Sequence, residues 1–116
     1  MYVLDKSAGL KNMAGDLELY QEVLHEYYKE NEGTLEKLSL AISEKRYEDA
    51  TQIVHKIKGS SGSIGARVLY DASVKLQKAL KEEKEEEILP LEEKFSDLLK
   101  KLFEEIKEFK GKKAVR

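Results

Sequence analysis

The spacing of the apolar residues constrains the fold more than any other feature of the sequence. Along most of the 116 residues, apolar side chains recur every three or four positions, which matches the turn of an α-helix of about 3.6 residues. No segment shows the apolar–polar alternation of a half-buried strand. The single proline, Pro90, leaves long stretches free of helix breakers. The pattern therefore predicts an all-α protein.

Helical stripes follow one another with short breaks between them. They are expected over the following stretches: 16–30, Leu35 to Ile42, 47–63, Leu69 to Leu80, and Leu91 to Phe109. Because short connections favour antiparallel neighbours, we expect an antiparallel up-down bundle of four principal helices. An additional short N-terminal helix within residues 5–14 is expected to pack across the bundle as a lid. Together these predictions place one domain at residues 1–109 and a frayed basic tail at residues 110–116.

Local signals mark the ends of several predicted helices. Asp16 is a typical N-cap for the helix over residues 16–30. Gly33 and Thr34 are expected to interrupt the chain and to cap the next helix. Gly65 is a typical C-terminal stop, because glycine adopts the left-handed conformation that ends many helices.

The segment before the last helix has two interpretations. Residues 81–87 are almost all Lys and Glu and are expected to form a solvated connection or helix end. Pro90 suits the first turn of a helix, because its missing N–H would have no partner there. Alternatively, the last helix begins at Glu86, and Pro90 kinks it.

Composition excludes several classes of function. Lys and Arg number 21 and nearly balance the 23 Asp and Glu, which gives a net charge of −2 and no reason to expect nucleic acid or an anionic membrane as partner. The absence of cysteine excludes disulfides, thiolate metal sites and cysteine catalysis. No stretch approaches the roughly 18 apolar residues that span a membrane. We expect a cytoplasmic protein without membrane insertion, and a monomer, because the internal core uses the apolar stripe of each helix.

The predicted helix over residues 47–63 carries the most informative residues. At about 100° per residue, its apolar side chains gather on one side, together with the isoleucine that follows: Tyr47, Ala50, Ile53, Val54, Ile57 and Ile64. His55 falls roughly 140° from the centre of that stripe and is expected to point into solvent. A lone exposed histidine is usually an ordinary surface residue. A neutral imidazole is nevertheless a competent nucleophile near neutral pH, since its unperturbed pKa is about 6.5.

The neighbours of His55 favour the functional interpretation. Gly59 and Gly62 follow four and seven residues later on the same side of the helix. Each glycine inside a helix costs about 1 kcal/mol of stability relative to alanine. The bare strip of backbone at Gly59 and Gly62 therefore has no stability rationale. Alternatively, the helix simply ends near Lys58. A partner could approach the imidazole closely over this strip. Lys58 can reach the same patch and lower the cost of a phosphoryl group on the ring.

The segment over residues 55–66, His-Lys-Ile-Lys-Gly-Ser-Ser-Gly-Ser-Ile-Gly-Ala, resembles the His-x-x-Lys-Gly…Gly-Ala signature of histidine-containing phosphotransfer (HPt) domains, especially those of hybrid sensor kinases. The segment over residues 10–20 resembles the opening of the same family. The resemblance extends over residues 3–106.

The resemblance implies a phosphorelay intermediate rather than an enzyme. His55 would accept a phosphoryl group from, and donate it to, the aspartate of response-regulator receiver domains, and a sensor histidine kinase is a further expected partner. The receiver would supply Mg²⁺, so the domain needs no cofactor or metal of its own and has no kinase activity. Some members carry an acidic residue on the next helix that orients the imidazole. Gln77 stands at the matching position, where it can accept the same hydrogen bond without adding charge.

Two other functions remain open at this stage. The chain could be the phosphoacceptor domain of a chemotaxis-type histidine kinase, or a helical module that docks receivers without accepting phosphate. A purely structural bundle would explain the apolar stripes but not the histidine with its glycines. The second histidine, His25, is expected to be partly exposed at the edge of the bundle. The chain can be a free-standing protein or part of a longer hybrid kinase.

Overall fold

The described chain is helical throughout. The structure, a computed structural model, describes residues 2–109 in full and residues 110–115 by their backbone only, so the expected frayed tail, residues 110–116, lies outside the fully described residues. Within the described part, no strand occurs and the prediction of an all-α fold is confirmed. The helices are α1 (Lys6–Asn12), α2 (Leu17–Asn31), α3 (Thr34–Ser43), α4 (Tyr47–Ile64), α5 (Arg67–Lys81) and α6 (Glu85–Val115).

Most helix ends lie where the local signals predict them. Asp16 caps α2 by accepting the Leu19 N–H at 3.0 Å. Gly65 ends α4 with φ +92°, the left-handed conformation that suits glycine. The break between α2 and α3 falls at Gly33, but Thr34 does not cap α3: Gly33 occupies the cap position without a side-chain hydrogen bond.

The start of the last helix corrects one prediction. Pro90 lies inside α6 rather than in its first turn, so the helix begins five residues earlier than a start at Pro90 requires. The alternative start at Glu86 is wrong by a single residue. Three consecutive glutamates, beginning with Glu85, occupy the first turn, where the helix dipole favours negative charge. Ile88 follows them into the core with 1% of its surface exposed, which extends the helix ahead of the proline.

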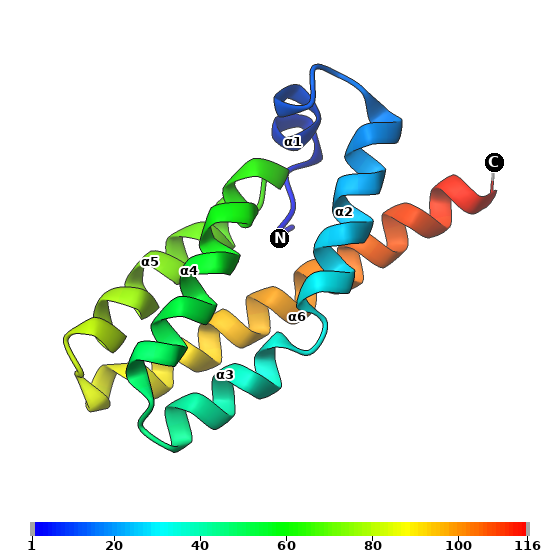
Figure 1. The fold of residues 1–116 in the computed structure, drawn as a ribbon. Coiled ribbons are helices and arrows are strands. Elements are labelled where there is room, and N and C mark those ends of the chain that lie inside the picture. The colour runs from blue at the N-terminus through cyan, green and yellow to red at the C-terminus, as the bar shows by residue number, and fades with distance from the viewer. Residues whose placement is uncertain (1, 116) are drawn as a thin grey trace.

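The helices pack around one core. α4 packs most extensively against α5, α5 packs against α6, and both α2 and α3 contact α4. Figure 1 shows α4, α5 and α6 running in alternating directions, with α2 and α3 following one another along the opposite side. The largest fully buried side chains come from every helix after α1: Tyr20, Leu24, Leu38, Ile57, Ile64, Leu69, Leu76, Leu80, Ile88, Phe95, Leu99 and Leu102.

The short helix α1 covers the C-terminal end of α4, as expected of a lid (Figure 1). The Asp5 N–H donates to the Gly65 carbonyl at 2.9 Å, and the Tyr20 hydroxyl donates to the Ile64 carbonyl at 2.7 Å. Gly9 lies so close to this carbonyl and to the Tyr20 ring that any side chain there would collide with both. The lid therefore fixes the end of the helix that carries His55.

A buried carboxylate, which the sequence pattern does not distinguish from solvated glutamates, holds the segment before α1. Glu105 of α6 is only 6% exposed and accepts hydrogen bonds from the Val3 N–H at 2.9 Å and from the Leu4 N–H at 2.8 Å. Backbone N–H groups stabilise a buried carboxylate because they supply hydrogen bonds in place of water. Glu105 thus ties the start of the chain to the last helix.

Over the described residues, no helix is long and apolar enough to cross a membrane.

Candidate functional site

Helix α4 presents two different sides, and His55 lies on the outer one. Ala50, Val54 and Ile57 are fully buried and Ile64 is 1% exposed, so the apolar stripe faces the core. His55 is exposed, as its position on the helix predicts. Tyr47 and Ile53, also expected in the stripe, are only partly buried against the core cluster.

Gln77 of α5 lies against the inner ring nitrogen of His55. Its Nε2 atom is 3.4 Å from His55 Nδ1, a distance at which the amide N–H makes a long hydrogen bond to the ring nitrogen. Gln77 is 7% exposed, so its surroundings hold the side chain in place. Among the described residues, no hydrogen bond to His55 Nε2 is found. The outer nitrogen is therefore the one available to a partner.

The Gln77 amide can favour either tautomer of the imidazole, depending on which of its ends faces Nδ1. Nε2 of the amide lies against Nδ1, and an amide N–H there favours the tautomer in which Nδ1 accepts and the ring proton is on Nε2. Half a turn about the last side-chain bond presents the amide oxygen instead, which accepts a proton from Nδ1. That arrangement leaves a lone pair on His55 Nε2, as a nucleophile requires.

The two glycines of α4 differ in their surroundings. A Cβ atom at Gly59 would meet nothing within 4 Å, so the backbone there is open to an approaching surface. A Cβ atom at Gly62 would lie 3.4 Å from the Tyr70 ring of α5, which is ordinary contact. Gly59 thus provides the bare stretch that the sequence predicts, whereas the surface beside Gly62 is partly formed by Tyr70.

Lys58 and α5 complete the surroundings of His55. Lys58 is half-buried and takes part in no ion pair with the described residues. On α5, Val74 is 43% exposed, and Lys78 directly follows Gln77 with its side chain exposed. The sequence did not predict the position of Tyr70 beside Gly62, because it depends on how α5 is aligned against α4.

A buried tyrosine supports the site from the α2 side. The Ser61 hydroxyl donates to the Ile57 carbonyl at 2.6 Å, so the Tyr27 hydroxyl, 3.0 Å from Ser61 Oγ, donates to it. Burial raises the pKa of Tyr27 to about 12, and the Ser61 hydrogen bond offsets this only in part. Tyr27 is therefore neutral at physiological pH and joins α2 to α4 without charge.

Comparison with known families identifies the chain. The model of the Hpt domain family matches residues 22–109, well over half of the sequence. The chain belongs to the Hpt domain family. This Hpt domain has a histidine phosphotransfer role in a phosphorelay, as its family indicates, and the helical bundle fits that role. Neither the curated proteins nor the solved structures contain a significant match to the sequence.

The family match confirms the resemblance to Hpt domains from residue 22 onward, whereas the resemblance of residues 10–20 and the particular likeness to hybrid sensor kinases stay predictions. Hpt domains are phosphocarrier modules that interact with receiver domains and kinases of two-component systems and are not kinases themselves. His25, the second histidine, is partly exposed on α2 as expected. The roles of His55, Lys58, Gly59 and Gln77 are proposals, which the geometry described above supports.

Proposed function

We propose that this Hpt domain carries a phosphoryl group on Nε2 of His55 and exchanges it with the aspartate of receiver domains. The observation that carries the proposal is the environment of the ring: it is exposed, its inner nitrogen faces the buried Gln77, and open backbone at Gly59 lies one turn away. No other described histidine combines these features, since His25 has no glycine strip beside it.

The transfer is a simple displacement at phosphorus. The lone pair of His55 Nε2 attacks the phosphoryl group of the receiver's aspartyl phosphate, a P–N bond forms, and the aspartate leaves as a carboxylate. With the Gln77 amide turned so that its oxygen faces Nδ1, the proton on Nδ1 stays in place, hydrogen-bonded to that oxygen. The reverse reaction returns the group to a receiver, so the same geometry serves both directions.

In this proposal, a lysine of the Hpt domain and a metal ion of the receiver both assist the transfer. Lys58 lies one turn after His55 and supplies a flexible cation that follows the phosphoryl oxygens. We propose that Mg²⁺ comes from the receiver, because carboxylate-rich receiver sites suit this cation. The Hpt domain then contributes the nucleophile and one cation, and needs no cofactor of its own.

The remaining features of the molecule fit this role. We take the bundle to be an antiparallel up-down four-helix bundle in which α2 and α3 together form one side (Figure 1). We expect a cytoplasmic monomer, because the apolar stripes of the helices are used by the internal core.

A labelling experiment tests the proposal. Receiver domains phosphorylated with labelled acetyl phosphate and Mg²⁺ are mixed with the protein, and the protein is then tested for acid-labile, base-stable label. We expect labelling of the wild type and of His25→Gln, and none of His55→Gln. Labelling that survives His55→Gln would refute the assignment. Receiver binding without any labelling would instead identify a docking module.

A second variant tests docking over the bare backbone. Gly59→Leu places a large side chain in open space without disturbing the fold, so circular dichroism should match the wild type. Transfer should fall because the side chain obstructs the approach to the imidazole. Transfer at the wild-type rate would show that receivers do not approach over Gly59.

A further inference from the structure

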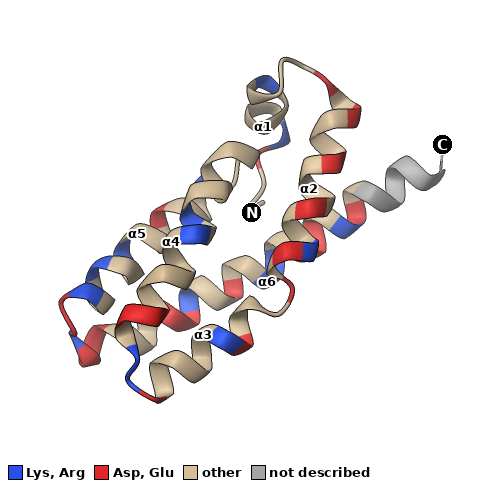
Figure 2. Cartoon of the chain, viewed as in Figure 1, with Lys and Arg blue, Asp and Glu red and all other residues tan. Residues whose placement is uncertain are grey.

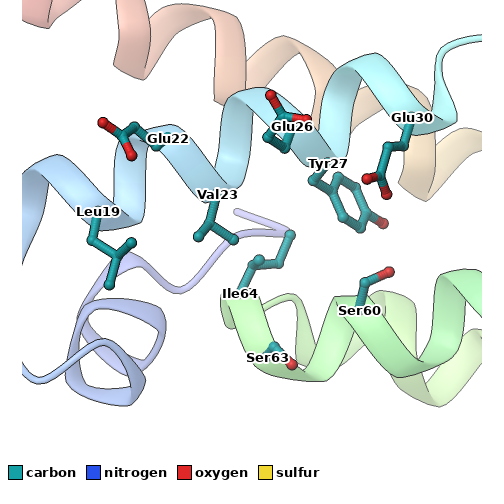
Figure 3. A pocket seen from close by; sticks show the side chains of 9 residues that line it. All are labelled: Leu19, Glu22, Val23, Glu26, Tyr27, Glu30, Ser60, Ser63 and Ile64. Atoms are coloured by element: carbon teal, nitrogen blue, oxygen red, sulfur yellow. The ribbon is translucent and has the colours of Figure 1, made fainter.

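A groove lies between α2 and α4, beside the proposed site. It encloses a hollow of about 400 Å³, and Figure 3 shows Leu19, Val23 and Tyr27 of α2 pointing toward α4, while Glu22 and Glu26 lie on the outer side of α2. The lining residues are Leu19, Glu22, Val23, Glu26, Tyr27, Glu30, Ser60, Ser63 and Ile64. None of them has a role in the phosphoryl transfer described above.

The floor of the groove is apolar. Val23, Tyr27 and Ile64 form its base, with Tyr27 and Ile64 nearly buried and Val23 half-buried, and Leu19 remains 42% exposed at one end. An exposed leucine beside an apolar hollow leaves surface that a partner's apolar side chain would remove from water, at roughly 25 cal/mol per Å². The groove therefore fits an apolar side chain of a docking protein.

One rim of the groove is a row of unpaired glutamates. Glu22, Glu26 and Glu30 are spaced four residues apart along α2, and all three are exposed. Like charges at this spacing destabilise a helix by about 0.2–0.5 kcal/mol per pair. Among the residues that the structure describes in full, no Lys or Arg forms an ion pair with them. No close ion pair among the fully described residues offsets this cost.

The opposite rim joins the groove to the site of transfer. Ser60 and Ser63 of α4 line it, and Ser63 is the next residue along the helix surface from Gly59, four positions away. On the other side of the histidine, α4 and α5 contribute Lys58 and Lys78. Figure 2 shows the acidic residues along α2 and the basic residues on α4 and α5. The face around His55 is thus negative on one side and positive on the other.

We propose that this groove selects the receiver. It takes an apolar side chain flanked by Lys or Arg on the docking surface of the partner receiver domain, and its glutamates fix the orientation in which the receiver's aspartate meets His55. The inference rests on the proposed function. Charge complementarity identifies the occupant, since three unpaired carboxylates around an apolar floor favour a cationic partner surface and reject an acidic one.

A second copy of this chain is the other conceivable occupant, and the same charges disfavour it. A two-fold symmetric contact would bring the same surface of both copies together. Glu22, Glu26 and Glu30 would then face their own counterparts, and like charges across an interface cost free energy. A receiver with basic residues meets no such repulsion.

Kinetics of transfer test the proposal with a charge-matched control. Among purified receiver domains loaded with acetyl phosphate and Mg²⁺, the one that labels the wild type fastest is used over a range of concentrations. For Glu22→Lys/Glu26→Lys we expect the half-saturating concentration to rise about tenfold, with the maximal rate unchanged. The control, Glu93→Lys/Asp97→Lys, makes the same charge change at the same spacing on exposed positions of α6 and should behave like the wild type.

Two further measurements separate charge from shape. Higher ionic strength should weaken docking of the wild type more than docking of Glu22→Lys/Glu26→Lys, because salt screens exposed charges. Leu19→Ser, which leaves the charge unchanged, should raise the half-saturating concentration at every ionic strength.

The outcomes distinguish the two proposals. If the wild type is labelled but Glu22→Lys/Glu26→Lys matches the α6 control, the groove does not select the receiver, although the proposed function stands. If wild-type protein is a dimer in sedimentation and Glu22→Lys/Glu26→Lys is a monomer, the groove binds a second copy and the proposal is overturned. If no receiver labels the wild type, the proposed function fails and this inference fails with it.

Discussion

At the scale of single residues, the proposed phosphoryl transfer depends on a small set of side chains around the imidazole of His55. The ring of His55 has Gln77 on its inner side and an exposed outer nitrogen. Lys58 lies within one helical turn. In the proposed function, His55 is the nucleophile, Gln77 sets its tautomer and Lys58 supplies charge, so single substitutions can separate the three roles.

Substitution of Lys58 should slow the chemistry without changing the fold. Lys58→Ala removes the cation that follows the phosphoryl oxygens, so we expect the single-turnover transfer rate to fall about tenfold. Lys56→Ala, which removes a neighbouring exposed lysine, is the control for net charge. Circular dichroism compares the folds of the two variants, and transfer reactions stopped at successive times compare their rates. Equal rates for both variants would mean that Lys58 acts only through general charge.

Substitution of Gln77 should change the tautomer of His55. Gln77→Met keeps the volume of the buried side chain but removes its hydrogen bond, so nitrogen NMR should show a mixture of ring tautomers. Gln77→Glu presents a carboxylate to Nδ1 and should favour the form with its proton there. We expect transfer to slow in the first variant and to be retained in the second. An unchanged tautomer ratio in Gln77→Met would show that Gln77 does not orient the ring.

At the scale of elements, helix ends and the segment before α1 determine where the site lies. α4 ends at Gly65 beneath the lid, and Glu105 ties residues 3 and 4 to α6. These contacts are remote from the imidazole in sequence, and they hold the helix that carries it.

The two glycines Gly59 and Gly65 should respond in opposite ways to alanine. Gly65 has φ +92°, and a Cβ atom there would collide with the Asp5 carbonyl, so Gly65→Ala should lower the free energy of unfolding by about 2 kcal/mol or more. Gly59→Ala adds a methyl group in open space within a helix and should raise it by about 1 kcal/mol. Urea denaturation measures both. A destabilised Gly59→Ala would contradict the helical environment described for that residue.

Loss of the buried carboxylate should destabilise the whole bundle. Glu105→Ala leaves the N–H groups of Val3 and Leu4 without partners, and we expect a loss of about 2–4 kcal/mol in the free energy of unfolding. Glu104→Ala changes an exposed neighbour and should stay within about 0.5 kcal/mol of the wild type. Chemical denaturation of both variants tests this. Similar values for the two would mean that the segment before α1 contributes little to stability.

At the scale of the whole molecule, one core joins helices that are distant in the sequence. Tyr20 and Tyr27 of α2 reach the carbonyl of Ile64 and the hydroxyl of Ser61 on α4. Burial of these phenols makes the stability of the entire bundle sensitive to alkaline pH.

The fold should lose stability in alkali because of these two tyrosines. Burial, assisted at Tyr20 by the nearby Asp5 carboxylate, raises the pKa of each to about 12 from the ordinary value of 10.0. A pKa that is higher in the folded state means that the stabilisation is complete below about pH 10 and is lost as pH rises through about 12. Denaturation curves across this range should show a steep fall. The fall should be smaller in Tyr20→Phe/Tyr27→Phe and unchanged in Tyr2→Phe, which alters an exposed ring.

Much of the fold could be predicted because the helical pattern is local. The exposure of His55 follows from its angle to the buried stripe of α4, and the stop at Gly65 follows from the conformation that glycine permits. The start of α6 was mispredicted because the local preference of Pro90 for a first turn was weighed without the buried Ile88 ahead of it.

The sequence alone determined the class of fold, the helix that carries His55 and the side of that helix on which His55 lies, since periodicity and glycine conformation act over a few neighbouring residues. Only the tertiary structure decided that Tyr70 lies beside Gly62, that Glu105 is buried, and that a glutamate-lined groove borders the site. These features depend on how separate helices are aligned, and alignment is set by packing of side chains far apart in the chain.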